Sequence, residues 1–116
     1  MTHIPELVLL DASCLLNLYA TGRLRDIAAA QPYSFGAADY VVRQEALYTL
    51  RPAPGERTYE RVPVNMDPLV DEGVVQVLHL EGQEEAATFV DLAALVDDGE
   101  AITAALAFHR GFALAI

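Results

Sequence analysis

This chain of 116 residues has no tryptophan, no lysine and a single cysteine, Cys14. One cysteine cannot form an internal disulfide, and its neighbours Leu15 and Leu16 indicate a buried thiol rather than a catalytic one. No apolar run reaches the roughly 18 residues of a membrane-spanning helix, so we expect no membrane contact. The start, MTHIPE, lacks the basic region and apolar core of an export signal, which favours a cytoplasmic protein. No zinc-ligand spacing relates the histidines His3, His79 and His109.

Positive charge is scarce, since seven arginines face 17 acidic residues and give a net charge of −10. This balance argues against a freestanding nucleic-acid binder, which normally carries a basic surface. The acids gather in the second half, where residues 62–116 hold ten acids and one arginine. Four arginines and two tyrosines cluster in the first half and predict contacts with RNA or a protein partner, or else a solvated helix end and loop. They are Arg43, Arg51, Arg57 and Arg61, with Tyr48 and Tyr59.

Strand-like and helix-like patterns alternate along the chain. Apolar or β-branched runs at 7–10, 33–35, 74–80 and 112–116 predict strands. Helical spacing and end signals predict helices over 13–20, 24–30, 39–50, 67–72, 84–96 and 100–110. Residues 51–64 hold Pro52, Pro54, Gly55 and Pro63 and are expected to form the most mobile loop. The order predicts one domain over 1–116, an α/β three-layer sandwich with a mainly parallel central sheet.

Three acids stand where a carboxylate is locally costly or unneeded. Asp11 ends the apolar run LVLL, Glu45 lies in VVRQEAL, and Glu100 opens the small-residue stretch EAITAALA. Working sites of parallel sheets lie beyond the carboxyl ends of the strands, where Asp11 is expected. Carboxylates brought together repel one another unless a cation lies between them. If the fold gathers these three, their oxygens suit Mg²⁺ or Mn²⁺.

Each acid also has a simpler interpretation. Asp11 can cap the helix that follows it, a role compatible with metal binding. Glu45 can be an exposed helix residue. Glu100 can complete a capping box with Asp97 at the start of its helix. A shift in that helix start would put Asp98 in the place of Glu100 as a ligand.

The order and context of these motifs are similar to those of a known family. The motifs are VLLDAS at residues 8–13, the apolar approach to Glu45, and EAITAALA with Glu100 in place of the commoner aspartate. Together they resemble the PIN domains, in particular the toxin ribonucleases of the VapC kind. The resemblance extends over nearly the whole chain.

The resemblance implies a metal-dependent endoribonuclease, the toxin of a toxin–antitoxin pair. One or two Mg²⁺ or Mn²⁺ ions would be held by Asp11, Glu45 and Glu100. Asp98 is the alternative ligand to Glu100. Ser13 would support Asp11 through a hydrogen bond, and Asn17 lies one helical turn further on. The implied partners are an RNA substrate and a cognate antitoxin, and we also expect a homodimer because the small domain is rich in apolar residues.

Members of the family usually carry a fourth acid directly after the next strand. Here FALAI runs to Ile116, so that acid would have to lie beyond it. The alternative is therefore a catalytically impaired PIN-like module that binds a basic or arginine-bearing protein, which the net charge of −10 favours. A phosphoacceptor receiver domain needs an acidic pair near the first strand and a later lysine, and both are missing.

Overall fold

The computed structural model describes residues 6–55 and 57–115. His3 and the end of the expected strand 112–116 lie outside this range, and so does Glu56. Within it no helix is long and apolar enough to cross a membrane.

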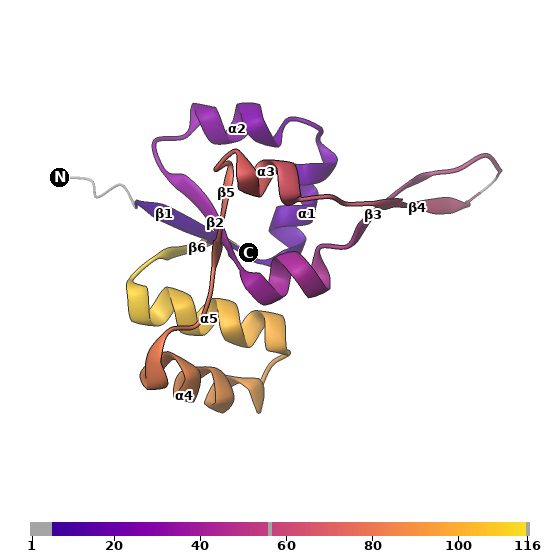
Figure 1. Cartoon of the computed structure of the whole chain (residues 1–116). Helices are drawn as coiled ribbons and strands as arrows, with labels where there is room; N and C mark the ends of the chain where they lie inside the picture. Colours follow the sequence, from indigo (N-terminus) through magenta and orange to yellow (C-terminus); the bar gives the residue numbers. More distant parts are fainter. Residues whose placement is uncertain (1–5, 56, 116) are drawn as a thin grey trace.

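A parallel sheet of four strands forms the centre of the molecule, which confirms the predicted fold class (Figure 1). The strands are β1 (Leu7–Leu10), β2 (Ser34–Ala38), β5 (Val75–Leu78) and β6 (Ala113–Ala115), in the order β5-β2-β1-β6. Every residue of β1 is buried, as expected for an inner parallel strand covered on both faces. Its registers pair Val8 with Phe35 of β2 and with Ala113 of β6.

Helices cover both faces of this sheet. In Figure 1, α2 (Leu24–Ala30) and α3 (Asp67–Asp71) lie on one side, and α5 (Asp98–Arg110) lies on the other. The helix α4 (Gly82–Ala93) packs on the outer side of α5, while α1 (Ala12–Ala20) contacts β1. The five α-helices of the described residues begin and end within three residues of the predicted bounds. Gly111 ends α5 in a left-handed conformation with φ 67°, which favours glycine.

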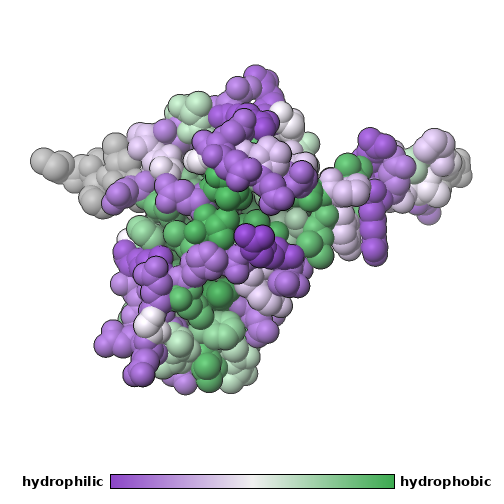
Figure 2. All heavy atoms as spheres, in the orientation of Figure 1, coloured by the Kyte–Doolittle hydropathy of each residue, from purple (hydrophilic) through white to green (hydrophobic). Residues whose placement is uncertain are grey.

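The core lies between the sheet and these helices. On the face seen in Figure 2, hydrophobic residues gather in the middle of the body. Leu9, Leu10, Leu15 and Leu106 are among its fully buried side chains. Truncating one such leucine to alanine costs about 2–5 kcal/mol, because a cavity adds to the lost transfer free energy. The core therefore fixes the position of β1 and α5, and both carry candidate site residues at their ends.

Two predictions for the middle of the chain were wrong. The expected helix 39–50 is only a short helical turn that continues as the π-helix η1 (Val41–Glu45). The expected loop 51–64 is part of a hairpin of β3 (Tyr48–Pro52) and β4 (Tyr59–Pro63). The β-prone residues Tyr48 and Thr49 favour a strand over the helix that the spacing predicted. Pro52 and Pro63 are the last residues of β3 and β4, and a two-stranded ribbon tolerates proline at strand ends.

We call residues 48–63 the arm, because the hairpin extends away from the body in Figure 1. It has little burial of its own, and Leu50 and Tyr59 are 62% and 67% exposed. Contacts across the two strands order it: Arg51 pairs with Glu60, and the guanidinium of Arg61 lies 4.5 Å from the centre of the Tyr48 ring. Two-stranded ribbons are marginally stable in water, so these contacts matter for its conformation.

Candidate acidic site

Asp11 is the residue directly after β1, at the carboxyl end of the sheet. Its side chain caps α1 by accepting a hydrogen bond of 2.8 Å from the backbone N–H of Cys14. Its own N–H donates to the carbonyl of Ala115 in the neighbouring strand β6. Strand and helix thus both hold Asp11 in place, and the capping interpretation is confirmed together with the strand-end position.

Glu45 is the last residue of η1, and its position depends on the π-helical register. The N–H of Ala46 donates to the carbonyl of Val41 at 2.8 Å, five residues back, which closes a wider turn than an α-helix would. Val41 and Ala46 are buried on either side of the turn. Their burial anchors the backbone while the Glu45 carboxylate reaches across to the start of α5.

The start of α5 supplies the opposite wall. Asp97 caps the helix by accepting a hydrogen bond of 2.9 Å from the N–H of Glu100, which is half of the predicted capping box. Glu100 lies in the first turn and is exposed. Gly99 is buried between them, and Thr103 donates its hydroxyl to the Gly99 carbonyl at 2.7 Å.

A small pocket of about 140 Å³ unites these elements, and we call it the acidic pocket. Burial raises the pKa of Glu45 above its usual value, and the nearby carboxylates of Asp97, Glu100 and Asp11 raise it further. The three acids singled out in the sequence are therefore brought together, while their role as ligands stays a prediction. The lining residues are Asp11, Ala12, Ser13, Glu45, Asp97, Gly99 and Glu100.

The supporting residues differ from the expectation in three respects. Asp97, which the sequence suggested only as a cap, lines the acidic pocket, whereas Asp98 does not. Ser13 lines the pocket, but in the described part of the chain no hydrogen bond links it to Asp11, whose Oδ1 accepts from the Cys14 amide instead. Asn17 is exposed on α1 and is not among the lining residues. The signal for Asp97 was the cap itself, because a capping carboxylate must lie at the helix end nearest Glu100.

The acidic pocket offers only oxygen donors, which fits the preference of Mg²⁺ and Mn²⁺. As placed, the carboxylates line a common space without converging on one point. Among residues 6–55 and 57–115, no group of three or more histidines, cysteines and acids is arranged to hold a metal ion. The donor chemistry therefore fits a hard cation, and closing around it requires rotation of side chains such as the exposed Glu100.

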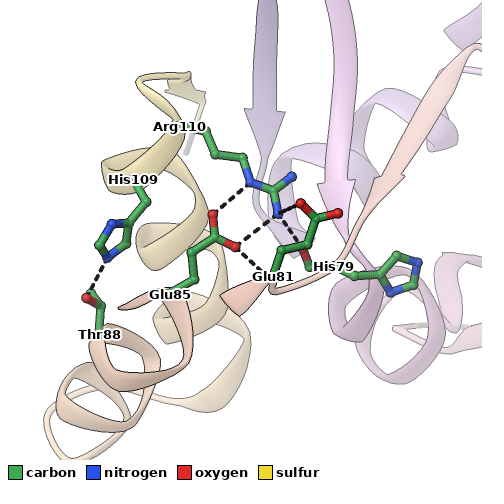
Figure 3. Close-up of polar contacts among 6 residues, drawn as sticks. All are labelled: His79, Glu81, Glu85, Thr88, His109 and Arg110. Carbon is green, nitrogen blue, oxygen red and sulfur yellow. Dashed lines mark hydrogen bonds and ion pairs between the residues drawn. The ribbon is translucent and has the colours of Figure 1, made fainter. Parts of the chain in front are cut away.

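A partly buried ion pair fixes the connection that leaves β5, and no sequence pattern predicted it (Figure 3). Arg110, near the end of α5, donates to both carboxylate oxygens of Glu85 on α4, at 2.9 and 3.0 Å. The same guanidinium donates to the carbonyl of His79, and Glu85 also accepts from the N–H of Glu81 at 2.7 Å. The Arg110 hydrogen bonds lower the pKa of Glu85 to about 2. We call this set the Arg110 clamp.

The arginines predicted as RNA or partner contacts fall into two places. Arg51, Arg57 and Arg61 lie on the arm with Tyr59, whereas Arg43 lies on η1. Arg43 donates its Nε–H to Asp39 at 2.7 Å. The arm thus carries three of the seven arginines of the chain.

Comparison with known proteins returned nothing: no family model, no curated protein and no solved structure matches this chain.

Proposed function

We propose that the chain is a metal-dependent endoribonuclease of the PIN kind, the toxin of a toxin–antitoxin pair. The observation that carries the proposal is the acidic pocket, where Asp11, Glu45, Asp97 and Glu100 meet at the carboxyl end of a parallel sheet. Four acids in one small space repel one another without a cation, and the pKa of Glu45 is raised first by burial and then by the neighbouring carboxylates. Helix capping accounts for Asp11 and Asp97, whereas Glu45 is brought to them from another element, η1.

Asp11, Glu45 and Glu100 would hold Mg²⁺ or Mn²⁺, with Asp97 beside them in place of the expected Asp98. A bound ion would supply Lewis acidity and positive charge for hydrolysis of a phosphodiester bond. The backbone of the chain does the positioning. The α1 cap holds Asp11, the π-helix directs Glu45, and Gly99 leaves room for its carboxylate.

The arm would give the RNA its secondary contacts. Arginine and tyrosine side chains bind phosphates and stack on bases, and Tyr59 and Arg57 are exposed on it. The cognate antitoxin would compete for the same surface. We also propose a two-fold homodimer, because Leu50, Leu95 and Phe108 are 62%, 80% and 76% exposed.

A second candidate is a protein-binding module without catalysis. A hollow of about 370 Å³ beside the acidic pocket shares Asp11 and Glu100 with it and is otherwise lined mainly by apolar residues such as Leu92, Val96 and Leu114. Two carboxylates beside an apolar surface suit a peptide with one basic and one apolar side chain. In this alternative the acids bind an arginine or lysine in place of a metal.

Cleavage of a labelled RNA with Mn²⁺ tests the first candidate. We expect cleavage that EDTA stops and that Glu45→Gln reduces at least about a hundredfold, whereas Glu84→Gln, an exposed acid in the first turn of α4, leaves it unchanged. Isothermal calorimetry with Mn²⁺ on the same variants gives an independent readout. Absence of both cleavage and Mn²⁺ binding, with tight binding of an arginine-bearing peptide, would establish the second candidate.

A further inference from the structure

A third hollow lies at the same end of the sheet as the acidic pocket and the apolar hollow beside it. Asp39 and His79 follow directly after β2 and β5, which are neighbouring parallel strands. Between them opens a crevice of about 290 Å³ that we call the β2–β5 crevice. Its lining includes Asp39, Tyr40, Arg43, His79, Leu80 and Ile102.

The β2–β5 crevice and the acidic pocket are adjacent. Gln44 of η1 lines the crevice and Glu45, the next residue, lines the acidic pocket. On α5, Ile102 lines the crevice and Glu100 the acidic pocket. One ligand that extends along the carboxyl end of the sheet can therefore reach both hollows.

The two hollows differ in charge. The acidic pocket has four carboxylates and no basic residue, whereas Arg43 and His79 accompany the single acid of the crevice, Asp39. Asp39 orients Arg43, because its Oδ1 accepts from Arg43 Nε at 2.7 Å, while its Oδ2 lies 3.7 Å from His79 Nδ1, too far for a hydrogen bond. The terminal nitrogens of Arg43 and the Nε2 of His79 remain for a ligand, and both side chains are more than 60% exposed.

The Arg110 clamp holds His79 at the rim of the crevice. Arg110 donates to the backbone carbonyl of His79, and in Figure 3 the imidazole points away from Arg110 and Glu85. The backbone of His79 is thus fixed from one side, and its ring faces the other side, where Asp39 lies. The crevice therefore presents two hydrogen-bond donors, Arg43 and His79, and the backbone of His79 is held in place by Arg110.

We propose that the β2–β5 crevice binds the nucleotide that neighbours the scissile phosphate. Its phosphate oxygens accept from Arg43 and His79, and its base lies over Tyr40 with Leu80 and Ile102 beneath. Aromatic rings stack on any base, and arginine suits phosphate because its terminal N–H groups are fixed in one plane. The inference rests on the proposed function for its substrate class, and it assigns Asp39 as a positioning residue.

Nuclear magnetic resonance titration of the metal-free protein tests this proposal without any need for catalysis. We expect uridine 5′-monophosphate to shift the backbone amides of residues 39–44 and 79–80. Uridine and inorganic phosphate should each bind about fivefold more weakly, because each makes only half of the contacts. Arg43→Gln should weaken the nucleotide about fivefold, whereas Arg23→Gln on the distant start of α2 should not change it.

Shifts confined to other surfaces, unchanged binding by Arg43→Gln, or equal binding of inorganic phosphate and nucleotide would each overturn the proposal. Steady-state cleavage of RNA separates this failure from failure of the proposed function. A Mn²⁺-dependent nuclease whose KM does not rise in Arg43→Gln contradicts the crevice alone. Nucleotide binding in the crevice of a protein that never cleaves RNA contradicts the nuclease alone.

Discussion

The carboxylate of Glu45 lies directly on the backbone of Gly99. A Cβ atom built at residue 99 would fall 1.8 Å from Glu45 Oε1 and 2.5 Å from its Cδ, far inside contact distance. Gly99 has an ordinary helical conformation, so its backbone does not require glycine. The missing side chain instead makes room for an acid that comes from another element of the fold.

Gly99→Ala should therefore move the Glu45 carboxylate without unfolding the protein. The clash is with the far end of a flexible side chain, and alanine favours a helix by about 0.5–1 kcal/mol over glycine, so we expect a net change in stability within about 1 kcal/mol. Affinity for Mn²⁺ should fall about tenfold or more, because a carboxylate of the pocket is displaced. Calorimetry and chemical denaturation measure the two quantities.

The matched control repeats the substitution in a Glu45→Gln background. If Gly99 acts through Glu45, the two losses of Mn²⁺ affinity should not add, as a double-mutant cycle reveals. Additive losses of Mn²⁺ affinity would mean that Gly99 acts through the conformation of α5 and not through Glu45.

Asp11 combines a cap with a candidate ligand, and two substitutions separate the roles. Asparagine caps helices as well as aspartate, so metal-free Asp11→Asn should keep or gain stability through relief of repulsion among the acids. Asp11→Ala should lose about 0.5–2 kcal/mol, because the Cys14 amide loses its acceptor. Both should lose Mn²⁺ affinity. Thermal melts in EDTA distinguish the two roles. A clear loss of stability in Asp11→Asn would mean that the negative charge of Asp11 stabilises the fold.

Glu45 should make the metal-free protein less stable as pH rises. Its pKa is raised in the folded state by burial and by Asp97, Glu100 and Asp11, so folding favours the protonated form. The favourable contribution is present at low pH and is lost as pH rises through the pKa of the folded protein. Glu45→Gln should thus be more stable than the parent at pH 7, with the difference shrinking as pH falls and absent below the ordinary glutamate pKa of 4.5. Equal stability of the two proteins at pH 7 in EDTA would contradict a raised pKa of Glu45 in the folded state.

The Arg110 clamp should show the opposite dependence. Hydrogen bonds from Arg110 lower the pKa of Glu85 from 4.5 to about 2, so its stabilising contribution is present above pH 4.5 and is lost as pH falls toward 2. At pH 7, Glu85→Gln should lower the free energy of unfolding by about 1.5–3 kcal/mol, through loss of a charged hydrogen-bond acceptor. Urea denaturation at pH 7 and pH 2.5 measures this. Glu84→Gln, beside it but exposed, should have no effect.

The sequence predicted the sheet well because its strands are short apolar runs between helices with clear end signals. Apolar runs alone predict the strands at Leu7–Leu10 and Val75–Leu78. The helices that connect the strands predict that they run parallel. The segment around the arm was predicted wrongly because the spacing of Val41, Val42 and Ala46 suits either kind of helix. Tyr48–Pro52 then forms a strand through pairing with Tyr59–Pro63, a contact that no local pattern reveals.

Some residues of the candidate site could be predicted from local sequence signals, and others could not. Asp11 was predictable as the end of a buried strand, and Glu100 as the start of a helix, because local signals mark both. Asp97 was predicted correctly as a cap, but its place in the pocket wall was not predicted, since a cap and a pocket wall look the same in sequence. The room that Gly99 leaves for Glu45, and the Arg110–Glu85 pair between α4 and α5, depend on how distant elements pack, so only the structure reveals them.

The position of β1 between β2 and β6 has a consequence for how the chain is made. On the ribosome β1 emerges before β2 and can pair with it as soon as β2 follows, whereas Ala113, the partner of Val8 in β6, emerges only after α5. Until then one edge of a fully apolar strand has no neighbour from its own chain. Pairing between residues so far apart in sequence is slow, and an open apolar edge attracts other nascent chains and chaperones. Synthesis of this protein should therefore be most prone to aggregation after β1 and β2 have formed and before β6 is released.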